Sequence, residues 1–154
     1  PPFDAICSIV MIEAVGQAYW PSYFSTVARL LKPGGRACVQ SIVIDDALFE
    51  RYVQGTDFIQ QYVFPGGCLP SPARFRAAAQ QAGLRVVDEW AFGADYAETL
   101  RRWHSQFMQQ RTEVLAQGFD AKFLRTWEFY LAYCEAAFDS GNIDVVQFTL
   151  VKDE

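Results

Sequence analysis

The sequence predicts an α/β domain built on parallel strands. Residues Ala5 to Ile12 form an apolar run that only Ser8 interrupts, as in a strand buried on both faces. A segment with helical spacing follows, and a second apolar run occupies Arg36–Ile44. A strand, a helix and another strand make a βαβ unit, whose two strands are parallel.

The composition fits a globular domain that binds no nucleic acid. Of the 154 residues, 51% are hydrophobic and 16% aromatic, which is enough for a core. The 18 acidic and 13 basic residues give a net charge near −5, and no basic stripe is present. The chain starts at Pro1-Pro2-Phe3 without Met, so we expect residues 1–154 to be a single partial domain.

The cysteines and the hydropathy indicate a cytoplasmic protein. No stretch is long and apolar enough to cross a membrane, and no signal peptide is visible. The cysteines are Cys7, Cys38, Cys68 and Cys134, and no CxxC spacing occurs. We therefore expect buried thiols in a reducing compartment, and neither a disulfide framework nor a metal site.

The first half of the chain supplies the helix and turn between the two strands. Helical spacing of apolar residues predicts a helix over Pro21–Leu31, and Lys32–Gly35 predicts its stop and a tight turn. The segment Asp45–Gln61 is expected to be helical in part. Two Gly and three Pro make Tyr62–Pro72 an irregular loop.

The second half begins with a capped helix. Ser71 is a predicted N-cap and Pro72 a first helical residue, with the helix running to about Ala82 and stopping at Gly83. A third strand is predicted over Leu84–Phe92.

Two helical stretches and a final strand complete the chain. The stretches are Tyr96–Ala116 and Phe119–Phe138, and the strand is Ile143–Val151. We expect the bulky apolar residues of the stretches to face a core, namely Trp103, Phe107, Phe123, Trp127, Tyr130 and Leu131.

Glu13 is the first candidate site residue. It follows the apolar run directly, and ligands of open α/β sheets bind beyond the carboxyl ends of the strands. The other interpretation is a strand-terminal carboxylate that only faces water. His104 has no second ligand at metal-binding spacing and is expected to be structural. Cys68 has no visible base to pair with, so a structural role is favoured over a catalytic one.

Four segments give the chain a specific resemblance. In order, they are Phe3-Asp4 through Met11-Ile12-Glu13-Ala14-Val15-Gly16; Tyr62–Ser71, which reads YVFPGGCLPS; Phe92-Gly93-Ala94-Asp95-Tyr96 with Thr99-Leu100; and Tyr130-Leu131 through Ala136-Ala137-Phe138 to Ile143–Phe148. Together they resemble the carboxyl-terminal part of the cyclopropane-fatty-acyl-phospholipid synthases and mycolic acid cyclopropane synthases, which are S-adenosylmethionine-dependent methyltransferases.

The resemblance implies a fold. It is the later half of a Rossmann-like class I methyltransferase sheet, with strand order 4-5-7-6, an antiparallel last strand and added helices. The family's glycine-rich cofactor loop and ribose-binding acid belong to upstream strands, and no G-x-G-x-x-G occurs here. Cofactor-binding residues therefore stay unassigned, and this chain alone is expected to be inactive.

The resemblance also implies a reaction and a site. The family transfers a methylene or methyl group from S-adenosyl-L-methionine to the double bond of an unsaturated phospholipid acyl chain, at the inner face of the membrane. A bound bicarbonate removes the proton. The resemblance places that bicarbonate at Glu13, Gln40, Ile42 and Tyr96, with Glu13, Gln40 and Tyr96 in catalysis.

Gln40 departs from the family pattern. The family has His there, in a His-Thr-Ile run that reads Gln40-Ser41-Ile42 in this chain. An amide still donates a hydrogen bond but cannot take up a proton. That leaves open a product that is methylated and not cyclised, or a paralogue with another lipid substrate.

Two further functions stay open. One is methylation of a small soluble molecule, and the other is a non-catalytic half-domain. We also expect that the first strand presents a bare edge and an uncovered face, through which two copies form a homodimer.

Overall fold

The computed structural model describes residues 2–153. It divides into two compact units. The first unit comprises the residues up to Ala91 and those from Asp144 onward, and the second comprises Phe92–Ile143.

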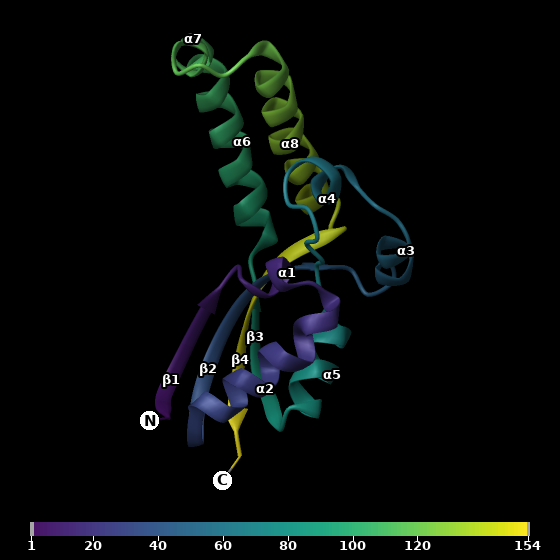
Figure 1. Ribbon diagram of the computed structural model, residues 1–154, viewed down its shortest axis with the longest axis vertical. Helices are drawn as coiled ribbons and strands as arrows, with labels where there is room; N and C mark the ends of the chain where they lie inside the picture. The colour runs from purple at the N-terminus through teal and green to yellow at the C-terminus, as the bar shows by residue number, and fades with distance from the viewer. Residues whose placement is uncertain (1, 154) are drawn as a thin grey trace. The chain divides into compact units, whose positions relative to one another are not determined.

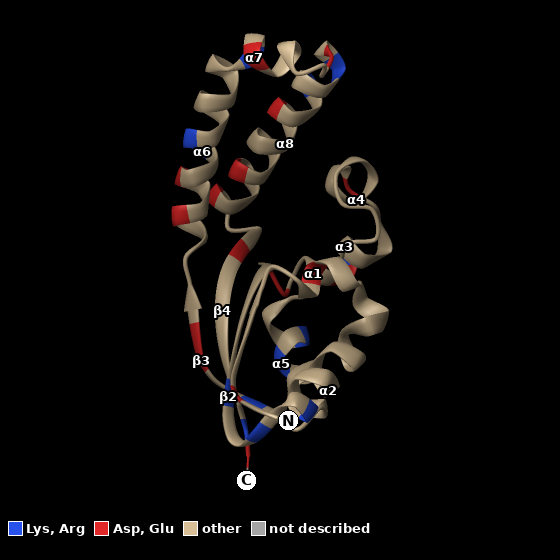
Figure 2. Cartoon of the chain, turned by 60° about the vertical axis from the view of Figure 1, so that its left-hand side comes forward, with Lys and Arg blue, Asp and Glu red and all other residues tan. Residues whose placement is uncertain are grey.

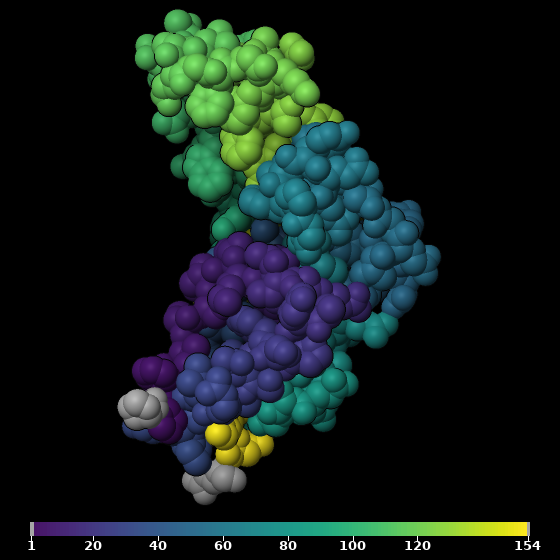
Figure 3. All heavy atoms as spheres, in the orientation of Figure 1, coloured from purple at the N-terminus to yellow at the C-terminus, as the bar shows by residue number. Residues whose placement is uncertain are grey.

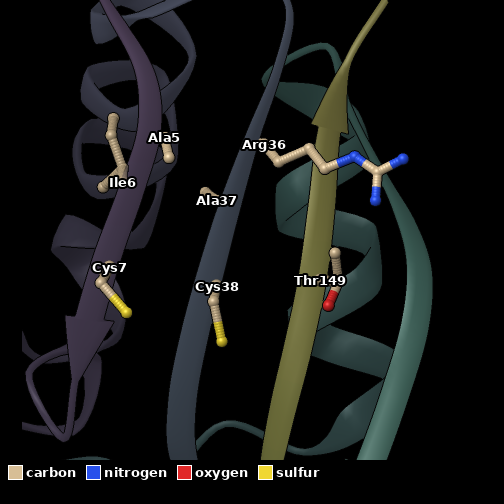
Figure 4. A pocket seen from close by; sticks show the side chains of 7 residues that line it. All are labelled: Ala5, Ile6, Cys7, Arg36, Ala37, Cys38 and Thr149. Atoms are coloured by element: carbon tan, nitrogen blue, oxygen red, sulfur yellow. The ribbon is translucent and has the colours of Figure 1, made fainter.

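The first unit contains a four-stranded sheet with the order β1-β2-β4-β3. Strands β1 and β2 are parallel, whereas β3 and β4 are antiparallel. Figure 4 shows the arrowheads of β1 and β4 pointing in opposite directions. The predicted order 4-5-7-6 and the reversed last strand are therefore confirmed. The strands are β1 (Phe3–Ile9), β2 (Leu31–Ile44), β3 (Leu84–Ala91) and β4 (Ile143–Lys152).

Five α-helices and one 3-10 helix connect the strands of this unit, among its described residues: α1 (Ile12–Val15), η1 (Gln17–Tyr19), α2 (Trp20–Leu30), α3 (Phe49–Gln54), α4 (Phe58–Tyr62) and α5 (Pro72–Gln81). The predicted cap of α5 is confirmed, because the Ser71 hydroxyl accepts a hydrogen bond from the N–H of Arg74 at 3.4 Å. Gly83 follows α5 with φ +77°, as expected of a helix stop.

Helices α2 and α5 pack on one face of the sheet (Figure 1). A column of three aromatic rings joins α2, α5 and β4. The Phe24 ring meets Phe75 edge-on at 5.0 Å, and Phe75 stacks on Phe148 of β4 at 3.9 Å. All three side chains are 0% exposed, so they form the centre of the core.

The other face of β1 and β2 is open. Figure 4 shows a shallow groove there, lined by Ala5, Cys7, Arg36, Cys38 and Thr149 among others. No residue of β1 is buried, so the prediction of a strand buried on both faces is wrong for the described residues. The predicted bare edge is confirmed, since β1 is an edge strand of this sheet. Cys7 is exposed, and Cys38, Cys68 and Cys134 are half-buried, which corrects the prediction of buried thiols.

The predicted turn at Lys32–Gly35 lies inside the span of β2. Phe3 pairs with Leu31 and Ala5 with Arg36, so β2 advances five residues while β1 advances two. The extra residues form the turn. A Cβ at Gly35 would lie 2.8 Å from the carbonyl oxygen of Lys32, which explains glycine at that position.

The second unit is a helical hairpin of α6 (Gly93–Gln109), α7 (Arg111–Ala116) and α8 (Ala121–Asp139). The first predicted stretch thus starts earlier and breaks at Gln110. Arg101 joins α6 to α8, with its Nη2 2.8 Å from Asp139 and its Nε 3.0 Å from Glu135. Figure 2 shows acidic residues along both helices.

The expected core positions of the aromatic residues in this hairpin need correction. Trp103 is 53% exposed, and of the predicted core-facing set only Leu131 is buried. A two-helix hairpin has one internal seam, and only a few of its apolar residues fill it. They are Ala97, Leu100, Leu124, Leu131 and Phe138.

We predict that Phe75→Ala lowers the free energy of unfolding by about 3–5 kcal/mol, because it removes a ring packed on two others without filling its space. Urea denaturation measures the change. Tyr19→Ala is the matched control, since Tyr19 is 66% exposed, and it should change stability by less than about 0.5 kcal/mol. Equal effects of the two substitutions would contradict this account of the core.

Candidate active site

Glu13 lies where the chain leaves the sheet. Strand β1 ends at Ile9, earlier than the apolar run suggested, and Val10 turns the backbone with φ +50°. Ile12 and Glu13 then open the short helix α1. Ile12 is 0% exposed and anchors this turn, while the Glu13 side chain is 8% exposed. The carboxylate is therefore held in the protein and does not simply face water.

The Glu13 carboxylate takes the place of the backbone acceptor that β1 would offer to β2 if the strand continued. The N–H of Val10 donates to the carbonyl oxygen of Gln40 at 3.0 Å, which is the last ladder bond between these strands. The next donor of β2 toward that side is the N–H of Ile42, because parallel ladders use alternate residues. Oε1 of Glu13 accepts that hydrogen bond at 2.6 Å. This hydrogen bond fixes the Glu13 side chain against β2.

Oε2 of Glu13 is buried and has no hydrogen-bond partner among the described residues. Burial raises the pKa of this carboxyl, although the N–H groups of Glu13 and Ile42 and the nearby Ser41 side chain act in the opposite direction. A buried polar atom without a partner is costly, so Oε2 is the atom of this site best suited to meet a ligand.

Gln40 lies two residues before Ile42 on β2, and both side chains are half-buried. Strand periodicity places the two on the same face of the sheet. The amide oxygen of Gln40 accepts a hydrogen bond from Nε2 of Gln147, on β4, at 2.9 Å. Its amide nitrogen makes no hydrogen bond to a described residue.

The irregular loop at Tyr62–Ser71 is hydrogen-bonded to the backbone of Glu13. The N–H of Cys68 donates to the Glu13 carbonyl oxygen at 2.8 Å. Gly16 approaches this loop so closely that a Cβ there would lie 3.4 Å from the carbonyl oxygen of Gly66. In Figure 3 the blue residues that lead into the loop lie directly beside the purple residues around α1. Two of the four segments that carry the resemblance therefore meet in space.

The hydroxyl of Tyr52 organises the same loop. It accepts hydrogen bonds from the N–H of Leu69 at 3.0 Å and from Nε2 of Gln60 at 3.2 Å. Nε2 of Gln60 also donates to the carbonyl oxygen of Gly67 at 3.0 Å. Burial raises the pKa of the Cys68 thiol, which agrees with a structural role for it.

The structure brings Glu13 and Ile42 into direct contact and places Gln40 on the same strand as Ile42. Tyr96 belongs to the second unit, near the start of α6. Its half-buried ring packs on Phe92 at 6.0 Å and on Phe138 at 5.4 Å. Its participation in the site of Glu13 stays a prediction.

Two residues of this site escaped the sequence analysis. Ser41 is 0% exposed, and its hydroxyl donates to the carbonyl oxygen of Ile42 at 2.8 Å. Gln147 is far from Gln40 in sequence, and only the pairing of β4 beside β2 brings them together. A polar residue within the apolar run of the last strand was the available signal for Gln147.

The remaining candidates are His104 and the cysteines, and a structural role for them stays a prediction. His104 lies 3.9 Å from Oε1 of Glu128 across the helical hairpin. All four cysteines are free, and no cluster of three or more metal-binding side chains occurs among residues 2–153. None of the helices in that range is both long and apolar enough to span a bilayer.

The pKa of Glu13 makes stability depend on pH. A pKa raised above the ordinary value of 4.5 means that folding favours the protonated carboxyl. We predict that the free energy of unfolding is highest below that value and falls as the pH rises through the raised pKa. Glu13→Gln keeps an acceptor for the Ile42 N–H and should flatten this profile. Urea titrations between about pH 4 and 8 measure it, and parallel profiles would contradict it.

Known proteins resemble nearly the whole of this chain. The family model for mycolic acid cyclopropane synthetase matches residues 1–148. The tuberculostearic acid methyltransferase UfaA1 of Mycobacterium tuberculosis is 46% identical over 154 residues, covering 98% of this chain and 36% of the relative. The cyclopropane-fatty-acyl-phospholipid synthase of Escherichia coli is 35% identical over 147 residues, covering 94% and 36%. The chain thus spans about a third of these relatives.

Solved structures agree on the fold. The cyclopropane synthase MmaA2 from Mycobacterium tuberculosis matches with a TM-score of 0.88 and 25% identity, covering 98% of this chain and 56% of that chain. The mycolic acid cyclopropane synthase CmaA1, complexed with SAH and CTAB, gives the same TM-score and coverage at 28% identity. Together with the sheet order and the family-model match, these findings show that the chain belongs to the mycolic acid cyclopropane synthetase family.

Proposed function

We propose that this chain supplies the proton-handling site of an enzyme that transfers a methyl group from S-adenosylmethionine to the double bond of an unsaturated acyl chain. The observation that carries the proposal is the buried Glu13 carboxylate. One oxygen is fixed by the Ile42 N–H at 2.6 Å, and the other is left without a described partner. The named relatives act on lipids or fatty acids, which supports an acyl substrate.

The residues fit a small oxyanion such as bicarbonate. Oε2 of Glu13 accepts a hydrogen bond from the anion's hydroxyl, and the Gln40 amide nitrogen donates to an oxygen of the anion. The N–H of Ile42 is engaged by Glu13, so its part here is to hold the carboxylate. Tyr96 is proposed to add a phenol from the second unit. Bicarbonate, when bound, supplies the base.

The chemistry explains why such a site is needed. S-adenosylmethionine, when bound, supplies an electrophilic methyl group. The two π electrons of the alkene form the new carbon–carbon bond, and the other alkene carbon becomes a cation. A proton must then leave. Its departure from the new methyl closes a ring, whereas its departure after a hydride shift leaves a branched alkene, which becomes a saturated methyl branch only when a separate hydride donor reduces it. The site of Glu13 keeps the base in place with few mobile waters.

A branched product is the second candidate, and two observations favour it. Gln40 cannot take up a proton as the family's His can, and its amide oxygen is already bonded to Gln147. The relative at 46% identity is named a methyltransferase and not a cyclopropane synthase. We propose that loss of the proton from the new methyl is less strongly directed in this protein.

We further propose that the acyl substrate belongs to a phospholipid, as the name of the Escherichia coli relative suggests, and that the chain meets it at the cytoplasmic surface of a membrane. Pairing of two copies across the open side of β1 belongs to the same proposal. Phe3 and Ile9 are 52% and 54% exposed along that strand, which supports such a contact.

Glu13→Gln should lower product formation by about 100-fold or more in the active methyltransferase that carries this chain, because an amide cannot accept the anion's hydroxyl proton as a carboxylate does. Binding of S-adenosylmethionine should stay nearly unchanged by calorimetry. Glu113→Gln is the matched control, since that carboxylate is exposed on α7 and should be dispensable. Turnover near wild type in Glu13→Gln would overturn the proposed role.

Gln40→His should shift the product toward the cyclopropane, because imidazole can take up a proton beside Glu13. Proton NMR of the extracted lipid separates ring from branch. A branched fraction that does not change would show that residue 40 does not control the outcome.

A further inference from the structure

Gln147 is hydrogen-bonded to the Gln40 side chain. Its Nε2 donates to the Gln40 amide oxygen at 2.9 Å, across neighbouring strands β4 and β2. Both side chains are half-buried, and neither carries a charge. A primary amide has one oxygen and one NH₂ group, so bonding the oxygen leaves the NH₂ group for another partner.

We propose that Gln147 is a positioning residue that holds the Gln40 amide with its NH₂ group, and not its oxygen, toward the anion beside Glu13. This inference rests on the proposed function, since it gives the anion site its orientation. An oxyanion needs donors, and an amide oxygen turned toward it would repel it. Without Gln147, both orientations of the Gln40 amide become accessible.

The backbone around the pair supports a fixed orientation. The Gln40 carbonyl oxygen accepts the N–H of Val10 at 3.0 Å, so its strand position is set. Gln147 pairs with Trp90 on β3 and lies between the buried residues Val146 and Phe148. Both amides therefore extend from backbone that the sheet holds in place, and with Gln147 as the donor the Gln40 oxygen faces Gln147.

The test compares two substitutions that orient Gln40 differently. Gln147→Glu keeps the shape but can only accept, so it should attract the Gln40 NH₂ group and turn the oxygen toward the anion. Gln147→Leu only removes the restraint. We expect the bicarbonate concentration for half-maximal activity to rise about tenfold in Gln147→Leu and further in Gln147→Glu, with the KM for S-adenosylmethionine unchanged. Thr149→Val, on the same strand face, is the control and should change neither value.

A second readout does not depend on turnover. In protein labelled with ¹⁵N-glutamine, Gln40→Leu identifies the Gln40 side-chain signals by their loss. Added bicarbonate should move these signals in the unsubstituted protein and move them less in Gln147→Leu.

The outcomes separate the two claims. Equal movement in the unsubstituted protein and in Gln147→Leu, or a Gln147→Glu variant no more impaired than Gln147→Leu, would overturn the role of Gln147. If bicarbonate moves no Gln40 signal and does not affect turnover of the unsubstituted protein, the proposed anion site itself is wrong.

Discussion

The hydrogen bond from the N–H of Ile42 to Oε1 of Glu13 is the interaction on which the candidate site depends. Strand β1 leaves the sheet at Val10, and β2 continues beyond it. The N–H of Ile42 then has no backbone acceptor on β1, and a buried donor left unpaired would cost about 1–3 kcal/mol. The Glu13 carboxylate satisfies it, and the same bond fixes the direction of the other carboxylate oxygen.

The burial of Glu13 affects both its protonation and its hydrogen bonding. Burial raises the pKa of the Glu13 carboxyl and leaves Oε2 without a hydrogen-bond partner among the described residues. The loop at Tyr62–Ser71 is tied to the same residue, because the N–H of Cys68 donates to the Glu13 carbonyl oxygen. Glycines at the closest approaches allow the loop backbone to lie against α1. The site is therefore assembled mainly from backbone contacts.

The sheet itself is asymmetric in its packing. The column of Phe24, Phe75 and Phe148 unites α2 and α5 with one face. The opposite face carries the groove beside Cys7 and Cys38, which includes none of Glu13, Gln40 and Ile42. Gln40 and Ile42 belong by strand periodicity to that same face, farther along β2. The open face thus leads toward the end of the sheet where the candidate site lies.

Much of this protein was determined by its sequence alone. Apolar runs of the right period predicted every strand, and Ser71-Pro72 and Gly83 marked the ends of α5, because these signals act over a few residues. The family and the strand order followed from four spaced segments. Exposure of Trp103 could not be predicted, since an apolar side chain looks the same in sequence whether or not a neighbour covers it.

Only the tertiary structure decided how the site is held. Glu13 was predictable as a residue at a strand end. Its hydrogen bond to Ile42 depends on the residue at which β1 leaves β2, and a shift of that point by one residue would change the bond. Gln147 joins Gln40 because β4 enters the sheet between β2 and β3. Contacts between residues so distant in the chain arise from strand pairing, and no local pattern in the sequence encodes the partner.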